Sequence, residues 1–111
     1  MTSAGFRRIA LGLEGAIEKN HHGHPDFRVG NRIFATLGYP DAKWGVVVLT
    51  PDQQRTWVRA HAAAFVPVKG AWGEQGCTTV RLDAVNEETL GAALTLAWQN
   101  GVKRKEAGGR G

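Results

Sequence analysis

The sequence has few of the residues on which covalent cross-links and nucleophilic catalysis depend. Cys77 is the one cysteine, and Ser3, close to the amino terminus, is the one serine. A single cysteine excludes an internal disulfide and any metal site built from several thiolates. Ser3 lies where chains are least ordered, which argues against a serine nucleophile. The composition therefore excludes a disulfide scaffold and lacks the usual nucleophile pairs.

Long apolar segments are also missing. The aliphatic run at residues 46–49 is far shorter than the roughly 20 residues that cross a bilayer as a helix. Arg7 and Arg8 lie near the start, but no apolar core of a signal peptide follows them. Together with the lone cysteine, these features predict a cytoplasmic protein that makes no membrane contact.

What is present is typical of a small globular domain. The chain has 111 residues, 42% of them hydrophobic and 22% charged, with four tryptophans and four phenylalanines. Such a composition supports one modest core and is unlike that of a disordered chain. We expect one domain over residues 1–100, followed by a basic, glycine-rich, disordered tail over residues 101–111.

The hydrophobic spacing predicts an α+β fold. Apolar residues from Phe6 to Ile17 recur at helical intervals, which favours a helix over residues 3–18, although Gly12 and Gly15 could end it earlier. Three extended stretches follow, then a helix opened by Thr50 and Pro51.

Two further strands and a closing helix that begins at Asn86 and stops at Gly101 complete the pattern. The predicted order is α-β-β-β-α-β-β-α. We expect a two-layer sandwich, with a mostly antiparallel five-stranded sheet and helices on one face.

The net charge of +4 is concentrated at the carboxyl end. Residues 101–111 hold four Lys/Arg and one Glu, a net of +3, which leaves +1 for the rest of the chain. A basic tail attracts nucleic-acid phosphates without sequence preference. The alternative is a solvated end that only improves solubility.

Side chains for catalysis or metal binding are sparse. His22 and His24, two apart on an expected strand, would face the same side as Asp26 and make a weak Zn²⁺, Ni²⁺ or Cu²⁺ candidate. Exposed histidines at a strand entry are the simpler interpretation. Cys77 begins an alternating strand and resembles a packed cysteine more than a nucleophile. We expect no enzyme activity, no cofactor and no small-molecule substrate.

Basic residues interleaved with aromatics suggest a nucleic-acid surface instead. Arg28, Arg32 and Lys43 lie on consecutive expected strands, where Arg28 and Arg32 could form a basic stripe on the open face of the sheet. A loop with Lys69 and Trp72 could contact phosphate and stack on or wedge between bases. Ordinary surface charges and a tryptophan covering the edge of the core would give the same pattern. The candidate DNA contacts are Arg28, Arg32, Lys43, Lys69, Trp72, Lys103, Arg104 and Lys105.

Three blocks of the sequence resemble one known family. Residues 18–37 read EKNHHGHPDFRVGNRIFATL, residues 64–80 read AFVPVKGAWGEQGCTTV, and a helical segment at residues 90–98 follows. In this order and spacing they resemble the MmcQ/YjbR family over roughly residues 3–100. At two positions the chain departs from the family's pattern: Cys77 stands where an aromatic is usual, and Asp26 where a small or apolar residue is usual.

The resemblance implies a two-layer fold like that of secretion chaperones and a double-wing surface that binds double-stranded DNA. The resemblance implies no enzyme activity or cofactor. The DNA-contacting role that it implies applies to four residues within the matching blocks: Arg28, Arg32, Lys69 and Trp72. The alternative is a protein-interaction module that holds extended peptides. Four tryptophans exceed the evident needs of such a small core, so an exposed Trp44 or Trp72 would mark a partner surface.

Overall fold

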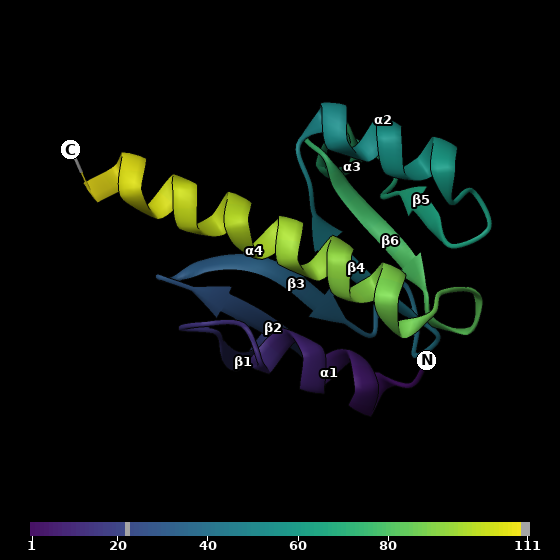
Figure 1. Cartoon of the computed structure of the whole chain (residues 1–111), viewed down its shortest axis with the longest axis horizontal. Helices are drawn as coiled ribbons and strands as arrows, with labels where there is room; N and C mark the ends of the chain where they lie inside the picture. Colours follow the sequence, from purple (N-terminus) through teal and green to yellow (C-terminus); the bar gives the residue numbers. More distant parts are fainter. Residues whose placement is uncertain (22, 110–111) are drawn as a thin grey trace.

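The structure, a computed structural model, describes residues 1–21 and 23–109, with the backbone alone for His21 and residues 105–109. These residues form six strands and four α-helices, and the first four strands follow one another directly after the first helix (Figure 1). In chain order the elements are α1 (Ser3–Leu11), β1 (Ile17–His21), β2 (His24–Val29), β3 (Arg32–Leu37), β4 (Trp44–Val48), α2 (Pro51–Ala60), β5 (Phe65–Pro67), α3 (Ala71–Glu74), β6 (Cys77–Arg81), the 3-10 turn η1 (Leu82–Ala84) and α4 (Glu87–Gly109).

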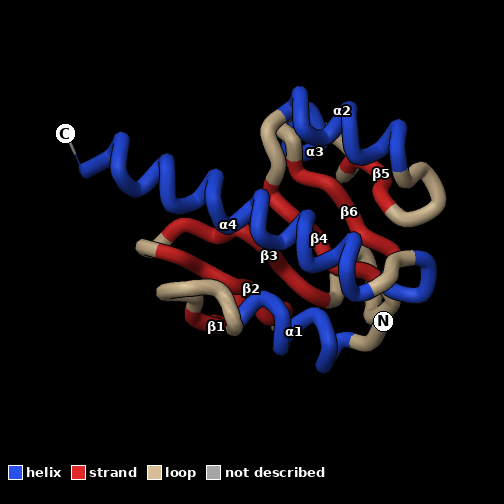
Figure 2. The backbone as a smooth tube through the Cα atoms, viewed as in Figure 1, coloured by secondary structure: helices blue, strands red, loops and turns tan. Residues whose placement is uncertain are grey.

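The strands form one sheet in the order β1-β2-β3-β4-β6-β5, and every neighbouring pair is antiparallel. Helices α1, α2 and α4 lie on one face of this sheet, with α4 running across its middle (Figure 2). The α+β class with an antiparallel sheet is therefore confirmed. The strand number and the order of elements were wrong, because the sheet has six strands and α3 is an additional helix.

The sixth strand arises because the first helix is shorter than its apolar spacing suggested. Helix α1 ends at Leu11, and Gly15 has a φ of +75°, a left-handed conformation that a helix cannot continue through. Ile17, expected on the buried helical stripe, starts β1 instead and is 46% exposed. Strand β1 pairs with β2 through a turn at Gly23, whose N–H donates to Asn20 Oδ1. Local hairpin chemistry therefore overrode the helical period here.

The core lies between the sheet and the helices. Phe6 of α1, Phe27 of β2 and Phe34 of β3 are completely buried, together with Leu90 and Leu94 of α4. Burial of each such side chain contributes roughly 1.5–3 kcal/mol, so these five residues make a large contribution to the stability of the domain.

The starts of α2 and α4 were predicted well, but the ends of α1 and α4 were not. Thr50 caps α2 in a capping box with Gln53, and Asn86 Oδ1 accepts from Thr89 N–H at the start of α4, as expected. Helix α4, however, does not stop at Gly101 but continues to Gly109. The division into a domain over residues 1–100 and a tail over 101–111 stays a prediction.

No helix among the described residues combines the length and apolarity that a membrane span needs.

Candidate nucleic-acid interface

A tight hairpin joins β2 to β3 at one end of the sheet. Gly30 and Asn31 both have positive φ, 55° and 66°, the two left-handed residues of a type I′ turn. This turn sets Arg32 opposite Val29, and cross-strand partners share a face of the sheet. Because Val29 is a buried core residue, Arg32 starts on the face that α4 covers.

Helix α4 crosses this hairpin with its carboxyl-terminal turns. A Cβ built on Gly101 would lie 4.0 Å from Arg32 Cβ and 2.8 Å from Val29 Cγ1, so the helix and hairpin backbones are in close approach. One turn later, Arg104 Nη2 donates to the Ile33 carbonyl at 3.5 Å. Figure 1 shows α4 continuing past the end of the sheet at this point. We call Arg32, Lys103 and Arg104, all exposed, the hairpin–helix surface.

Within the described part of the chain, the basic residues of this surface lack the ion pairs that most other arginines of the domain make. Five arginines are neutralised by carboxylates at hydrogen-bond distance: Arg7 by Glu18, Arg8 by Glu87, Arg28 by Asp26, Arg55 by Asp52 and Arg81 by Asp83. Arg32, Lys103 and Arg104 make no ion pair with any acidic side chain that the structure describes. Their charges are therefore directed to solvent, where a phosphate could meet them.

Arg28 lies elsewhere, on the opposite face of the sheet. It is cross-strand to Ile33, and its guanidinium binds the carboxylate of Asp26, which is 1% exposed. Its hydrogen bond to Asp26 raises the pKa of Arg28, and burial opposes this to a smaller extent. Arg28 and Arg32 therefore do not form the basic stripe that an open face carrying both would have provided.

The other candidates are distributed over separate segments. Lys43 is exposed just before β4, and Lys69 is exposed between β5 and α3. Trp72 of α3 is 69% exposed, so it does not cover the core edge. The side chain of Lys105 lies outside the described residues. Of the described candidates, Arg32 and Arg104 lie on segments far apart in the sequence that folding brings into contact, and Lys103 is the exposed residue before Arg104.

The described residues contain no group of three potential metal ligands. His24 is exposed on β2, while Asp26 uses both carboxylate oxygens to accept from Arg28. His22 lies outside the described residues. Asp26 thus serves a structural ion pair, and the sequence could have indicated this pairing through the i, i+2 spacing of opposite charges on one strand.

Cys77 is half-buried at the start of β6. Burial raises the pKa of its thiol, and the positive charge of Arg104 partly offsets this. A raised pKa lowers the thiolate fraction near neutral pH, which is the reverse of what a nucleophilic cysteine needs. The arrangement is that of a packed cysteine.

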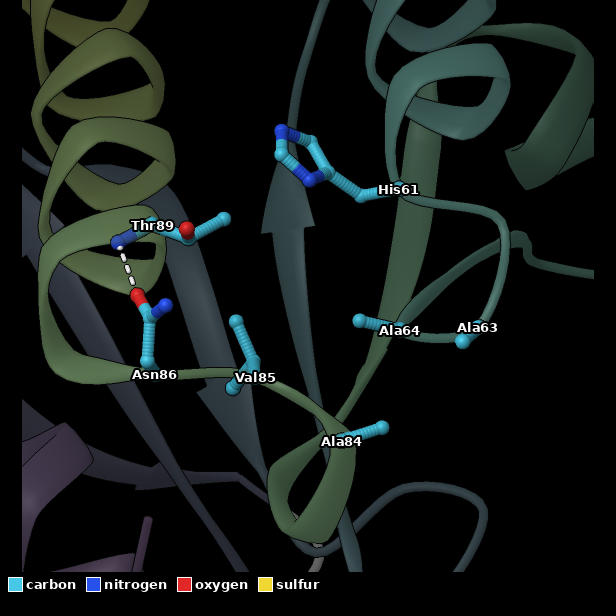
Figure 3. A pocket seen from close by; sticks show the side chains of 7 residues that line it. All are labelled: His61, Ala63, Ala64, Ala84, Val85, Asn86 and Thr89. Carbon is cyan, nitrogen blue, oxygen red and sulfur yellow. Dashed lines mark hydrogen bonds between the residues drawn. The ribbon is translucent and has the colours of Figure 1, made fainter.

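A cavity of about 170 Å³ separates the end of α2 from the start of α4 (Figure 3). His61 lies on one side of it, and Asn86 and Thr89, joined by their capping hydrogen bond, lie on the other. The His61 ring packs against Trp57 at 5.2 Å and Phe65 at 5.8 Å between centroids. None of the described residues lining the cavity supplies a cysteine, serine or carboxylate to this imidazole. Thr89 is the one hydroxyl residue among these lining residues, and no hydrogen bond joins it to His61.

Comparison with known proteins agrees with this architecture. The YjbR family model matches residues 11–100. The crystal structure of Deinococcus radiodurans protein DR2400, a DUF419 domain, matches with a TM-score of 0.72 and 21% identity over 87% of this chain and 75% of that chain. At that identity the likeness shows the fold alone. No curated protein matches the sequence. Because the family model covers well over half of the chain, this protein belongs to the YjbR family.

Proposed function

We propose that this protein is a non-catalytic DNA-binding module and that the hairpin–helix surface is its contact with the duplex. One observation carries the proposal. Folding brings Arg32 of the β2–β3 hairpin close to the carboxyl-terminal turns of α4, which carry the exposed Lys103 and Arg104, and no described carboxylate neutralises these three residues. Three uncompensated cations on a hairpin tip and a helix end form a surface suited to a phosphate backbone.

The geometry favours a duplex over a small anion. The three cations are exposed, and they spread along a projecting helix and a hairpin tip instead of converging on one point. A hairpin beside a protruding helix can follow a backbone on two sides of a groove. Such contacts release counterions, so affinity should fall steeply with salt, by roughly 0.9 logarithmic unit per contacted phosphate for each tenfold rise in salt.

The two side chains best suited to catalysis, the Cys77 thiol and the His61 imidazole, support the non-catalytic part of the proposal. Cys77 has a raised pKa, and the His61 imidazole packs against two aromatic rings beside a cavity whose described lining residues include no cysteine, serine or carboxylate.

The test is fluorescence anisotropy of the full-length chain with a labelled DNA duplex over a series of salt concentrations. Arg32→Ala, Lys103→Ala and Arg104→Ala should each weaken binding several-fold and lower the salt slope by about one contact. Arg59→Ala, which removes an exposed charge from α2, is the matched control and should leave affinity and slope near those of the wild type.

A second control concerns the basic residues whose side chains the structure does not describe. If a Lys105→Ala and Arg110→Ala double variant abolishes binding while the three hairpin–helix variants retain it, the binding belongs to the tail alone. The folded surface would then have no part in it.

A second candidate function is a protein-interaction module, and one observation favours it. Trp72 is 69% exposed on α3, although tryptophan is among the side chains that gain most from burial. Trp72→Ala should leave stability unchanged and reduce binding to a protein partner. A loss of stability without a loss of partner binding would instead give Trp72 a structural role.

A further inference from the structure

A groove of about 300 Å³ lies on the face of the sheet opposite the helices. Trp44, Val66 and Thr79 reach it from three adjacent strands, alternating with the buried Gly45, Phe65 and Val80. Tyr39 and Pro40 from the β3–β4 loop and Lys69 after β5 complete its walls. None of the three covering helices reaches this face, so the groove is open to solvent.

The groove is mostly apolar, and beside it the Arg81 guanidinium, paired with Asp83, lies 5.9 Å from the centre of the Trp44 ring. Thr79 Oγ1 donates to the Val66 carbonyl at 2.6 Å, so the hydroxyl on the floor is already satisfied. Lys69 is the one charged residue among the described residues that line the groove. Such a surface selects an apolar group with a negative charge beside it.

The neighbouring sheet edge does not accept a further strand easily. Strand β5 is the last in the sheet, and Val68 N–H and the Ala64 carbonyl bond to β6. The backbone groups of the alternate residues Phe65 and Pro67 therefore point away from β6, toward the open edge. Of these, the Phe65 N–H already donates to the His61 carbonyl, and Pro67 has no N–H. An occupant of the groove must therefore bind through its side chains and not by strand addition.

The size and the rim of the groove favour a segment of a protein. A volume of 300 Å³ is at the lower limit for a site enclosing a whole small molecule, but it accommodates one or two large side chains. Tyr39 and Val66, at 45% and 44% exposed, extend the apolar surface along the rim. Exposed Trp72 follows Lys69 closely in the chain.

We infer that this groove binds a linear segment of a protein partner that presents a large apolar side chain next to a carboxylate. The apolar side chain lies over Trp44 between Tyr39 and Val66, and the carboxylate meets Lys69. The inference rests on the second candidate function and is independent of DNA binding, since none of the residues that carry it belongs to the hairpin–helix surface.

The test is selection of a phage-displayed library of random linear peptides on the full-length protein. The peptides enriched most strongly are then synthesised with a fluorescent label, and their binding is measured by anisotropy. Enriched sequences should place Asp or Glu beside Phe, Leu, Ile or Trp. Lys69→Glu should weaken binding about fivefold or more, and Val66→Asp about tenfold or more.

Two controls complete the design. Arg59→Glu makes the same charge change as Lys69→Glu on the helical layer and should leave peptide affinity unchanged. Tyr39→Ser provides a second groove variant outside the strands should Val66→Asp not fold, with far-ultraviolet circular dichroism as the check. Val66→Asp should retain the wild-type affinity for duplex DNA.

Three outcomes overturn the inference. If no peptide is enriched, the groove has no such ligand, and the second candidate function loses its support as well. If peptides bind equally well to the groove variants, the protein-interaction function stands but its site lies elsewhere. Enrichment of basic or purely polar peptides contradicts the chemistry assigned to Lys69 and the apolar walls.

Discussion

Asp26 and Arg28, two residues apart on β2, form a two-pronged ion pair on the uncovered face of the sheet. Arg28 Nε donates to Oδ1 at 2.8 Å and Nη2 to Oδ2 at 3.1 Å. Asp26 is 1% exposed, and the guanidinium above it is 22% exposed. A carboxylate buried to this degree is stable only with charge-assisted partners, and Arg28 supplies two hydrogen bonds. The positive charge of Arg28, which the sequence suggested as a DNA contact, is therefore already paired with Asp26.

This ion pair predicts that its two members matter for stability and not for DNA. Asp26→Asn should lower the free energy of unfolding by about 1–3 kcal/mol, because a buried charge-assisted acceptor is lost. Arg28→Ala should also destabilise, since it leaves the carboxylate buried without its partner. Urea denaturation measures both effects. Anisotropy should show duplex affinity for Arg28→Ala close to that of the wild type, and a large loss would place Arg28 at the interface after all.

Gly101 on α4 provides a prediction about packing. Alanine at a helical position gains about 1 kcal/mol over glycine from helix propensity. At Gly101, however, the new methyl would lie 2.8 Å from Val29 Cγ1, and overpacking a core costs roughly 1–3 kcal/mol. Because Val29 is stiff and buried, we expect Gly101→Ala to destabilise by about 1 kcal/mol, as measured by urea denaturation.

Gly91 on the same helix is the matched control for Gly101. A Cβ built there meets no atom within 4 Å, so Gly91→Ala should stabilise the protein by about 0.5–1 kcal/mol. If both variants stabilise the protein equally, α4 does not approach the β2–β3 hairpin as closely as described, and the hairpin–helix surface loses its basis.

The thiol of Cys77 reports on the position of Arg104. Burial raises the pKa of Cys77, so iodoacetamide at pH 8 should alkylate it more slowly than free cysteine, because only the thiolate reacts. Arg104 lowers this pKa, and Arg104→Ala should therefore slow the reaction further. Arg59→Ala should leave the rate unchanged. Faster alkylation of Arg104→Ala would contradict the placement of its charge near the thiol.

The same pKa shift makes stability depend on pH in one direction. In the unfolded chain Cys77 loses its proton near the ordinary value of 9.0, whereas the folded protein keeps it to higher pH. The unfolded state then binds fewer protons, so this residue's contribution to stability is complete below pH 9 and decreases as the pH rises above it. Urea denaturation of wild type and Cys77→Ala between pH 8 and pH 10 should show a decrease that the variant lacks.

The capping box of α2 predicts a stability effect at an exposed residue. Thr50 Oγ1 accepts from Gln53 N–H at 3.2 Å, and Gln53 Oε1 accepts from Thr50 N–H at 2.9 Å. Thr50→Ala should lower the free energy of unfolding by about 1 kcal/mol, because two N–H groups at the helix start lose or weaken their partners. Thr56→Ala, inside the same helix, should change it by less than about 0.5 kcal/mol.

Much of the local structure could be predicted because short-range chemistry decides it. Thr50-Pro51 and Asn86 start helices, and Gly30-Asn31 forms a hairpin turn, in agreement with the residue patterns. The apolar spacing from Phe6 to Ile17 was misleading. Ile17 would fit either the buried stripe of a helix or a half-exposed strand. The left-handed conformation of Gly15 ends the helical path before Ile17, which therefore starts β1.

By itself the sequence determined the α+β class, most helix starts, the family and the candidate charges, since these follow from local periodicity, turn chemistry and composition. Tertiary structure alone decided which charges act together. The type I′ turn and the close approach of Gly101 to Val29 set Arg32 beside Arg104, whereas strand alternation turned Arg28 to the opposite face and into the Asp26 ion pair. Contacts between residues about 70 positions apart depend on packing against a shared core, and no local pattern encodes them.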